Sequence, residues 1–222
     1  MKKLVKLSLL LAGALSCQNM SAALVNFSGS PNAPIPDNNA SGLAFGFTVT
    51  TPFSSIDSVV VTLSISGGYN GDLYAYLSHG SGFAVLLNRV GVTGTDPLGY
   101  PDSGFNVTLS PGGTDIHQYR TTLGGAPAGG VVSGNWGADG RLVPTDATRA
   151  NTLDVFTGAN PNGAWTLFFA DRSAVGISTL NSWSVGIEAI PEPANIALGI
   201  FGVLFAGSQA VRLWSRRRTP RA

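Results

Sequence analysis

Two histidines, His79 and His117, are the side chains best suited to act as a general base near neutral pH. His79 lies two residues before Ser81, in the stretch His79-Gly80-Ser81-Gly82. A serine hydrolase needs a histidine that takes the serine proton and an acid that orients the histidine, and neighbours within one turn rarely reach that geometry. His117 has no cysteine or second histidine nearby with which to bind zinc. The sequence therefore predicts no enzyme activity, and it predicts that His79 is a solvated turn residue.

Aspartates offer a second kind of chemistry. Residues 24–190 contain ten Asp and no Lys, which favours calcium over other metal ions because hard cations bind several oxygen ligands. Asp37 and Asp72 fall in predicted loops and are the candidate ligands; Asp102 and Asp171 are weaker candidates. No stretch matches an EF-hand loop, and aspartate is common in turns because its side chain caps backbone amides. A purely structural role is thus the alternative, and no cofactor is required.

Tyrosines suggest a third possibility. Tyr74 and Tyr76 alternate with apolar residues, so in a strand both side chains lie on the face opposite to them. An aromatic stripe on an outer sheet face is suited to stacking on sugar rings. We expect instead that this face packs inward and that both tyrosines belong to the core, with sugar stacking as the alternative.

Composition limits the fold that can position these groups. The chain has 222 residues, of which 44% are hydrophobic, with 29 Gly and 13 Pro. So many helix-breaking residues without a collagen period favour an all-β chain rich in turns. Within residues 24–190, five Arg stand against ten Asp and Glu188, a net charge of −6. Nucleic acid is therefore not an expected partner.

The middle of the chain consists of short segments in which every second residue is apolar, as in Val59, Val61, Leu63 and Ile65. Gly-, Asn- and Pro-rich turns separate these segments, which predicts a single antiparallel β-sandwich without a second domain. Trp165 and Trp183 fall in the apolar register and are assigned to the core. The stretch 124–150 is predicted to be a long connection across one end. The predicted strands cover residues 45–49, 58–66, 73–77, 83–87, 105–109, 165–169 and 183–187.

The N-terminus, residues 1–23, is typical of a secretory signal peptide. Lys2, Lys3 and Lys6 precede the apolar run 7–15, and small residues end at Ser21-Ala22-Ala23, where we expect signal peptidase to cleave. A lipoprotein signal at Cys17 is the alternative. Cys17 is the only cysteine, so the fold must be stable without disulfide bonds.

The C-terminus, residues 191–222, combines three features. Pro191-Glu192-Pro193 precedes an uncharged stretch, 194–211, which as a helix would be about 27 Å long and is predicted to be transmembrane. A basic tail follows, which by the positive-inside rule stays in the cytoplasm; it contains Arg212, Arg216, Arg217 and Arg218. Together these features resemble the PEP-CTERM sorting signal. The resemblance implies a Gram-negative bacterium, processing by an exosortase, a transient inner-membrane anchor and, in many cases, an exopolysaccharide producer.

The middle region, 24–190, is similar to the P domain (P/Homo B domain) of proprotein convertases. This resemblance implies a jelly-roll sandwich that accompanies a subtilisin-like catalytic domain, and no part of that catalytic domain is present. The histidine that family members carry before the Gly-Asp-Leu turn is replaced by Ser66-Gly67-Gly68. The matching motifs are Ile35-Pro36-Asp37-Asn38-Asn39, Tyr69-Asn70-Gly71-Asp72-Leu73, Asn162-Gly163-Ala164-Trp165-Thr166-Leu167, Asp171-Arg172 and Leu180-Asn181-Ser182-Trp183-Ser184-Val185.

These observations predict an exported, exosortase-processed, non-catalytic β-sandwich that acts as a binding module at the cell surface or in the extracellular matrix. An exopolysaccharide and a separate protease are the two candidate partners, and the sequence does not name the ligand. The alternative is an accessory P domain that partners a separately encoded subtilisin-like serine endopeptidase.

Overall fold

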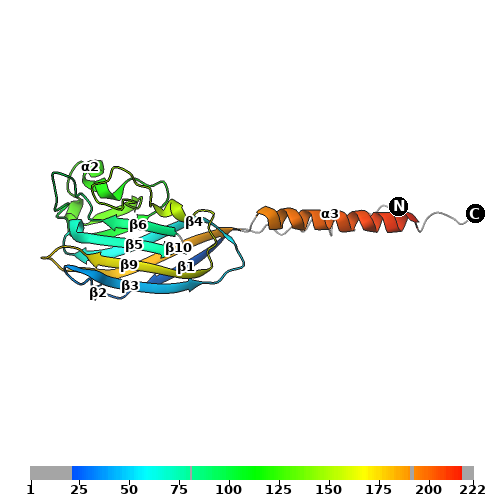
Figure 1. Ribbon diagram of the computed structural model, residues 1–222, viewed down its shortest axis with the longest axis horizontal. Helices are drawn as coiled ribbons and strands as arrows, with labels where there is room; N and C mark the ends of the chain where they lie inside the picture. Colours follow the sequence, from blue (N-terminus) through cyan, green and yellow to red (C-terminus); the bar gives the residue numbers. More distant parts are fainter. Residues whose placement is uncertain (1–21, 81, 191–192, 217–222) are drawn as a thin grey trace, which may run out of the picture. The chain divides into compact units, whose positions relative to one another are not determined.

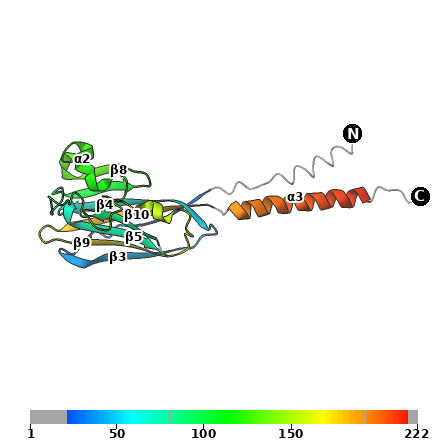
Figure 2. The ribbon, with the colours of Figure 1, turned by 45° about the horizontal axis from the view of Figure 1, so that its top comes forward.

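The structure is a computed structural model that describes residues 22–80, 82–190 and 193–216. Residues Ala23–Ala189 form one compact unit, a β-sandwich of two sheets (Figure 1). The helix α3, Pro193–Arg216, belongs to a separate unit. Figure 2 shows the two layers of the sandwich, with β3, β5 and β9 in one layer and β4 and β10 in the other.

The larger sheet has six strands in the order β1-β10-β4-β7-β8, with β2 also paired to β10. The smaller sheet has four strands in the order β3-β9-β5-β6. The strands of the larger sheet are β1 (Ala23–Gly29), β2 (Ala33–Pro34), β4 (Ser55–Gly67), β7 (Gly104–Leu109), β8 (Val132–Trp136) and β10 (Ser178–Ile190). The strands of the smaller sheet are β3 (Asn39–Val49), β5 (Leu73–His79), β6 (Gly82–Asn88) and β9 (Gly163–Asp171).

The alternating apolar residues form these strands because one face of each sheet can be buried while the other stays polar. In β4, Val59, Val61, Leu63 and Ile65 are at most 2% exposed, whereas the residues between them are half-buried. All seven strand segments predicted from the sequence lie within strands of the structure. The prediction of an all-β sandwich is therefore confirmed.

The stretch 124–150 differs from its prediction as a simple connection. It contains β8, which pairs in parallel with β7, so the sandwich is not purely antiparallel. A parallel pair needs a crossover connection, and residues 110–131 provide one through three short helices. These are η2 (Ile116–Gln118), α2 (Tyr119–Leu123) and η3 (Ala128–Gly130). Because β8 is short and contains Gly134, it lacks the alternation that reveals the other strands.

Aromatic side chains join the two sheets at the centre of the sandwich. Phe47 of β3 stacks on Trp165 of β9, with ring centroids 6.1 Å apart, and on Trp183 of β10, at 6.0 Å. Phe27 of β1 stacks on the ring of Phe47, with ring centroids 4.5 Å apart. Trp183 packs so closely on β1 that a Cβ at Gly29 would lie 2.8 Å from its indole nitrogen. The predicted core positions of both tryptophans are confirmed by exposures of 1% and 8%.

The helix α3 has exposed apolar side chains, among them Phe201, Leu204 and Phe205. No helix within the described residues is long and apolar enough to cross a membrane, so the predicted span over 194–211 is unsupported. The side chains of residues 194–198 lie outside the described set. The predicted signal peptide also lies outside it, apart from its last two residues, as do Pro191, Glu192, Arg217 and Arg218.

Truncation of either buried tryptophan is expected to leave the sandwich marginal or unfolded. Trp165→Ala and Trp183→Ala should each lower the free energy of unfolding by about 3–5 kcal/mol, out of a total of roughly 5–15 for a domain. Tyr74→Ala, on the half-buried outer face, should cost about 1–2 kcal/mol. Thermal and urea unfolding of the three variants measures the difference. Equal losses for Tyr74 and Trp183 would contradict this division between core and outer face.

Candidate functional site

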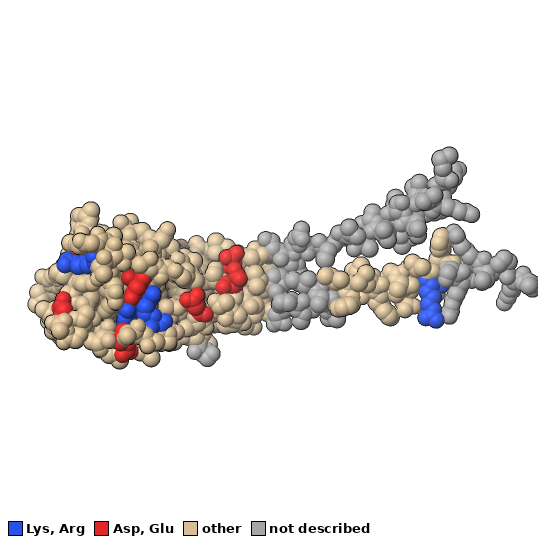
Figure 3. Space-filling model, turned by 90° about the horizontal axis from the view of Figure 1, so that it is seen from above, with Lys and Arg blue, Asp and Glu red and all other residues tan. Residues whose placement is uncertain are grey.

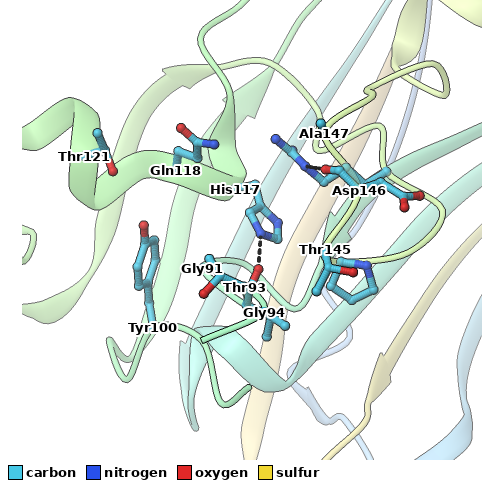
Figure 4. Close-up of a pocket in the computed structure, with 13 residues that line it drawn as sticks. Gly91, Thr93, Gly94, Tyr100, His117, Gln118, Thr121, Thr145, Asp146 and Ala147 are labelled. Atoms are coloured by element: carbon cyan, nitrogen blue, oxygen red, sulfur yellow. Dashed lines mark hydrogen bonds between the residues drawn. The ribbon is translucent and has the colours of Figure 1, made fainter. Parts of the chain in front are cut away.

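A cavity of about 460 Å³ opens at the side of the sandwich where three connecting segments meet. It is formed by three stretches of chain: 91–100, 117–121 and 141–147. Figure 4 shows Tyr100, Gln118 and Thr121 on one side, and Thr145 and Asp146 on the other. The imidazole of His117 lies between the two walls.

The aromatic wall of the cavity is fixed by packing from behind. The ring of Tyr100 meets the buried ring of Tyr119 edge to face, at a centroid distance of 4.7 Å. The guanidinium of Arg120 lies 5.4 Å from the centroid of Tyr100. Two backbone hydrogen bonds hold the residue: its N–H donates to the carbonyl of Val90, and its carbonyl accepts from the N–H of Gly71. Tyr100 is therefore preorganised rather than mobile.

A buried ionic network supports the floor and the opposite wall. Nδ1 of His117 lies 2.7 Å from Oδ2 of Asp139, and its Nε2 lies 3.0 Å from the carbonyl oxygen of Val92. Asp139, which is fully buried, also accepts a hydrogen bond from Arg141. Both imidazole nitrogens thus face oxygen acceptors, so these contacts hold the ring of His117 in place as part of the cavity floor.

Arg141 ties the loop 141–147 to the rest of the cavity. Its Nη1 and Nη2 donate to both carboxylate oxygens of Asp115, at 3.1 and 2.6 Å, and its Nε donates to the carbonyl of Asp146. Burial alone would raise the pKa of Asp115, but the hydrogen bonds and charge of Arg141 hold it below its ordinary value. Such a bidentate, largely buried ion pair holds the loop 141–147 in place more strongly than an exposed ion pair would.

Three polar side chains of the cavity are unengaged. Among the described residues, the side chains of Gln118, Thr121 and Thr145 make no hydrogen bond with the protein. Arg141 is the one arginine or lysine of the described lining, and it already forms ion pairs with Asp115 and Asp139. On the face seen in Figure 3, basic and acidic residues are intermixed on a largely uncharged surface. The cavity therefore suits a neutral ligand rich in hydroxyl groups better than an anion.

His79 does not have the environment predicted for it. Its ring stacks on Trp165 at a centroid distance of 4.1 Å and an interplanar angle of 4°. Its Nδ1 lies 2.9 Å from the carbonyl oxygen of Ala164, and its Nε2 lies 2.7 Å from that of Asn160. It is thus a packed histidine at the end of β5, and the prediction of a solvated turn residue is wrong. Ser81 lies outside the described residues.

Tyr74 and Tyr76 lie on the outer face of the smaller sheet, opposite the buried Leu73, Ala75 and Leu77, so the expected core placement is wrong. Their rings are taken up by neighbours. Tyr76 stacks on Phe168 at 4.8 Å and contacts Phe83 at 4.9 Å. Burial, with the nearby phenol of Tyr76, raises the pKa of Tyr74. The outer face therefore offers a ligand less free ring surface than the sequence suggests.

The predicted calcium candidates separate into two environments. Asp102 accepts two hydrogen bonds from Arg120 and one from Tyr119, each at 2.6 Å, so an arginine already balances its charge. Asp37 and Asp72 lie at one end of the smaller sheet, close to Asp171. No group of three or more His, Cys, Asp or Glu side chains within the described ranges is arranged to hold a metal ion.

The sequence reasoning missed the cavity residues Thr93, Tyr100, Gln118, Thr121 and Thr145. They come from three separate connections, and none belongs to a periodic or motif-like pattern. The one signal available was the pair Asp139 and Arg141, two charged residues in a Gly-rich stretch with few others.

No protein-family model matches the chain, and no curated protein matches it. A solved structure of the serine protease of Aeromonas sobria in complex with the chaperone ORF2 is 16% identical, with a TM-score of 0.42 over 77% of this chain and 28% of that chain. A structure of the serine protease of Aeromonas sobria gives 16% identity and a TM-score of 0.40 over 75% and 27%. The chain thus spans a little over a quarter of the length of these chains.

The pair between Asp115 and Arg141 predicts a loss of stability in acid. Because the folded pKa of Asp115 lies below its ordinary value of 3.8, the pair contributes fully above that pH and is lost as the pH falls through the folded value. Asp115→Asn should lower the free energy of unfolding by about 2–3 kcal/mol at pH 7 and reduce the further loss below about pH 4. Urea unfolding between about pH 7 and 2.5 measures both effects. An acid loss as large in the variant as in the wild type would show that other carboxylates cause it.

Proposed function

We propose that the chain is an exported, non-catalytic β-sandwich that binds a neutral polysaccharide at the cell surface or in the extracellular matrix. The cavity between residues 91–100, 117–121 and 141–147 is the proposed binding site. The observation that carries this proposal is the convergence of three unengaged polar side chains beside a rigid aromatic ring; these are Gln118, Thr121, Thr145 and Tyr100. Amide and hydroxyl groups match sugar hydroxyls, and the ring supplies an apolar contact.

The absence of an unpaired arginine or lysine within the described lining disfavours an anionic ligand. A phosphate- or sulfate-bearing ligand requires a cation with unused donors, whereas the guanidinium of Arg141 is engaged with Asp115, Asp139 and the carbonyl of Asp146. Asp146 adds a carboxylate at the rim, which disfavours anions further.

A binding role is favoured over hydrolysis because both described histidines are committed to packing and hydrogen bonding. A general base must be able to accept a proton from a nucleophile within hydrogen-bond reach. The ring nitrogens of His79 and His117 instead face carbonyl or carboxylate oxygens.

The route of export that we propose rests on the sequence. Pro191-Glu192-Pro193, the apolar stretch 194–211 and the arginines after it form the proposed PEP-CTERM signal, which an exosortase would recognise. A jelly-roll topology of P-domain type is proposed on the same ground, from the motifs around Asp72, Trp165 and Trp183.

Polysaccharide binding is tested with a panel of neutral glucans and galactans, with dextran sulfate as the anionic comparison, by affinity electrophoresis and then calorimetry. A neutral polymer should bind, and Gln118→Ala and Thr145→Ala should each weaken binding about three- to tenfold, since one hydrogen bond contributes about 0.5–1.5 kcal/mol. Both side chains are exposed, so the melting temperature should not change.

Tyr74→Ala is the matched control, because it removes an aromatic ring from the outer face of the smaller sheet and leaves the cavity intact. If this variant loses binding while the cavity variants keep it, the ligand uses the outer face. Preference for dextran sulfate would refute a neutral ligand. Binding to no polysaccharide, together with stable association with a subtilisin-like protease, would favour the accessory-domain alternative.

The sorting proposal predicts that the tripeptide and the helix act as one device. Replacing Pro191-Glu192-Pro193 with three alanines should leave a full-length precursor in the membrane fraction, while the wild type is shortened and released. Immunoblots of membrane and medium fractions measure this. Release of the variant at the wild-type rate would refute the proposal.

A further inference from the structure

Strand pairing brings three aspartates from distant parts of the chain to one end of the smaller sheet. Asp171 is the last residue of β9, and its partners across the sheet are Asn39 on β3 and Leu73 on β5. Asp37 therefore lies two residues before one partner, and Asp72 directly precedes the other. The N–H of Arg172 donates to the carbonyl oxygen of Asp72 at 2.8 Å, which ties the two segments together.

Two of these carboxylates are buried, and one has an oxygen without a partner. Asp72 is 5% exposed and Asp171 is 0% exposed. Oδ1 of Asp171 accepts from the N–H of Ser173, whereas its buried Oδ2 has no hydrogen-bond partner among the described residues. An unpartnered buried carboxylate oxygen is costly, so a native fold normally supplies it with a donor or a cation.

No protein cation fills this role within the described residues. Neither Asp72 nor Asp171 forms an ion pair with an arginine. Arg89 is the nearest source of charge for Asp72, but its Nε and Nη2 donate to the carbonyls of Gly71 and Pro97. Arg172 lies instead over the ring of Tyr74, 5.9 Å from its centroid.

The electrostatics of the cluster agree with this geometry. Burial raises the pKa of Asp171, and the carboxylates of Asp72 and Asp37 raise it further. Burial also raises the pKa of Asp72, although the charge of Arg89 and a hydrogen bond with the side chain of Ser173 oppose the shift. The three carboxylates are therefore close enough to repel one another, and a divalent cation would relieve that repulsion.

We propose that this end of the smaller sheet binds one calcium ion through the carboxylates of Asp72 and Asp171, and that the nearby charge of Asp37 strengthens the binding. Two buried carboxylates do not complete a calcium shell, which takes six to eight oxygens. Backbone carbonyls of the converging segments and water supply the others. Oxygen ligands without histidine or cysteine favour calcium over zinc. The ion joins the ends of β3, β5 and β9, which no disulfide joins.

A proton shared between Asp72 and Asp171 would also explain why the buried Oδ2 of Asp171 has no hydrogen-bond partner in the described part of the protein. It would also relieve the repulsion. The two accounts differ in their response to calcium and to pH, because a shared proton is favoured as the pH falls, whereas calcium binding is lost when the carboxylates are protonated.

The test uses the full chain, purified in mild detergent, stripped with a chelator and titrated with CaCl₂ or MgCl₂ at pH 7. Calcium at about 100 times its Kd should raise the melting temperature by roughly 5 °C or more, and magnesium should have a smaller effect. Calorimetry should give one calcium per chain. Asp171→Asn should abolish the shift. Asp102→Asn is the matched control, since it neutralises another buried aspartate that an arginine already pairs, and it should keep the shift.

Asp37→Asn keeps the test decisive if Asp171→Asn does not fold, because Asp37 is exposed. This variant should have an unchanged melting temperature without calcium and bind calcium at least about threefold more weakly. A wild type that does not respond to calcium, and that gains stability between about pH 7 and 5, would replace the ion with a shared proton. A full calcium response in both Asp37→Asn and Asp171→Asn would also overturn the proposal.

Discussion

The structure depends on an aromatic contact between its two sheets. Phe47 of the smaller sheet lies between the rings of Trp165 and Trp183, one from each sheet, and Phe27 closes the stack from β1. In a chain with a single cysteine near its N-terminus, no disulfide can take over this role within the sandwich. The burial of large side chains is then the main source of stability. The stack also orders the rim of the sheet, because Trp165 packs on His79 and thereby fixes the end of β5.

The strands could be predicted from the sequence because their signal is local. In Val59, Val61, Leu63 and Ile65 the side-chain period of two coincides with burial on one face. The first strand, around Val25 and Phe27, shows the same alternation. It was not predicted because it directly follows the predicted signal peptide, whose apolar residues mask the start of the pattern. β8 could not be found, because its stability comes from parallel pairing with β7, a contact between residues 27 positions apart that no local pattern encodes.

The cavity illustrates the limit of sequence reasoning more strongly. Its walls are held in place by hydrogen bonds between loops that are separate in the sequence. The most important of these bonds run from Arg141 to Asp115 and Asp139. The residues free to contact a ligand, Gln118 and Thr145, have no partner that would mark them. By contrast, the residues that attracted attention in the sequence, His79 and the paired tyrosines, form ordinary packing contacts. The histidine and the tyrosines that stand out in the sequence therefore have packing roles, while residue types that are common on protein surfaces line the candidate site.

One short segment, the 3₁₀ turn η1 (Asn70–Asp72), links the proposed calcium site to the cavity. At its start, the side chain of Asn70 donates to the hydroxyl of Tyr119, the ring that supports Tyr100. In its middle, Gly71 donates to the carbonyl of Tyr100, and a side chain at this position would collide with the carbonyl of Leu98. At its end stands Asp72. A cation that holds Asp72 thus restrains a turn that is bonded directly to the aromatic wall. Any such coupling is reciprocal: an ion that stiffens the wall favours ligand binding, and a bound ligand must favour the ion by the same free energy.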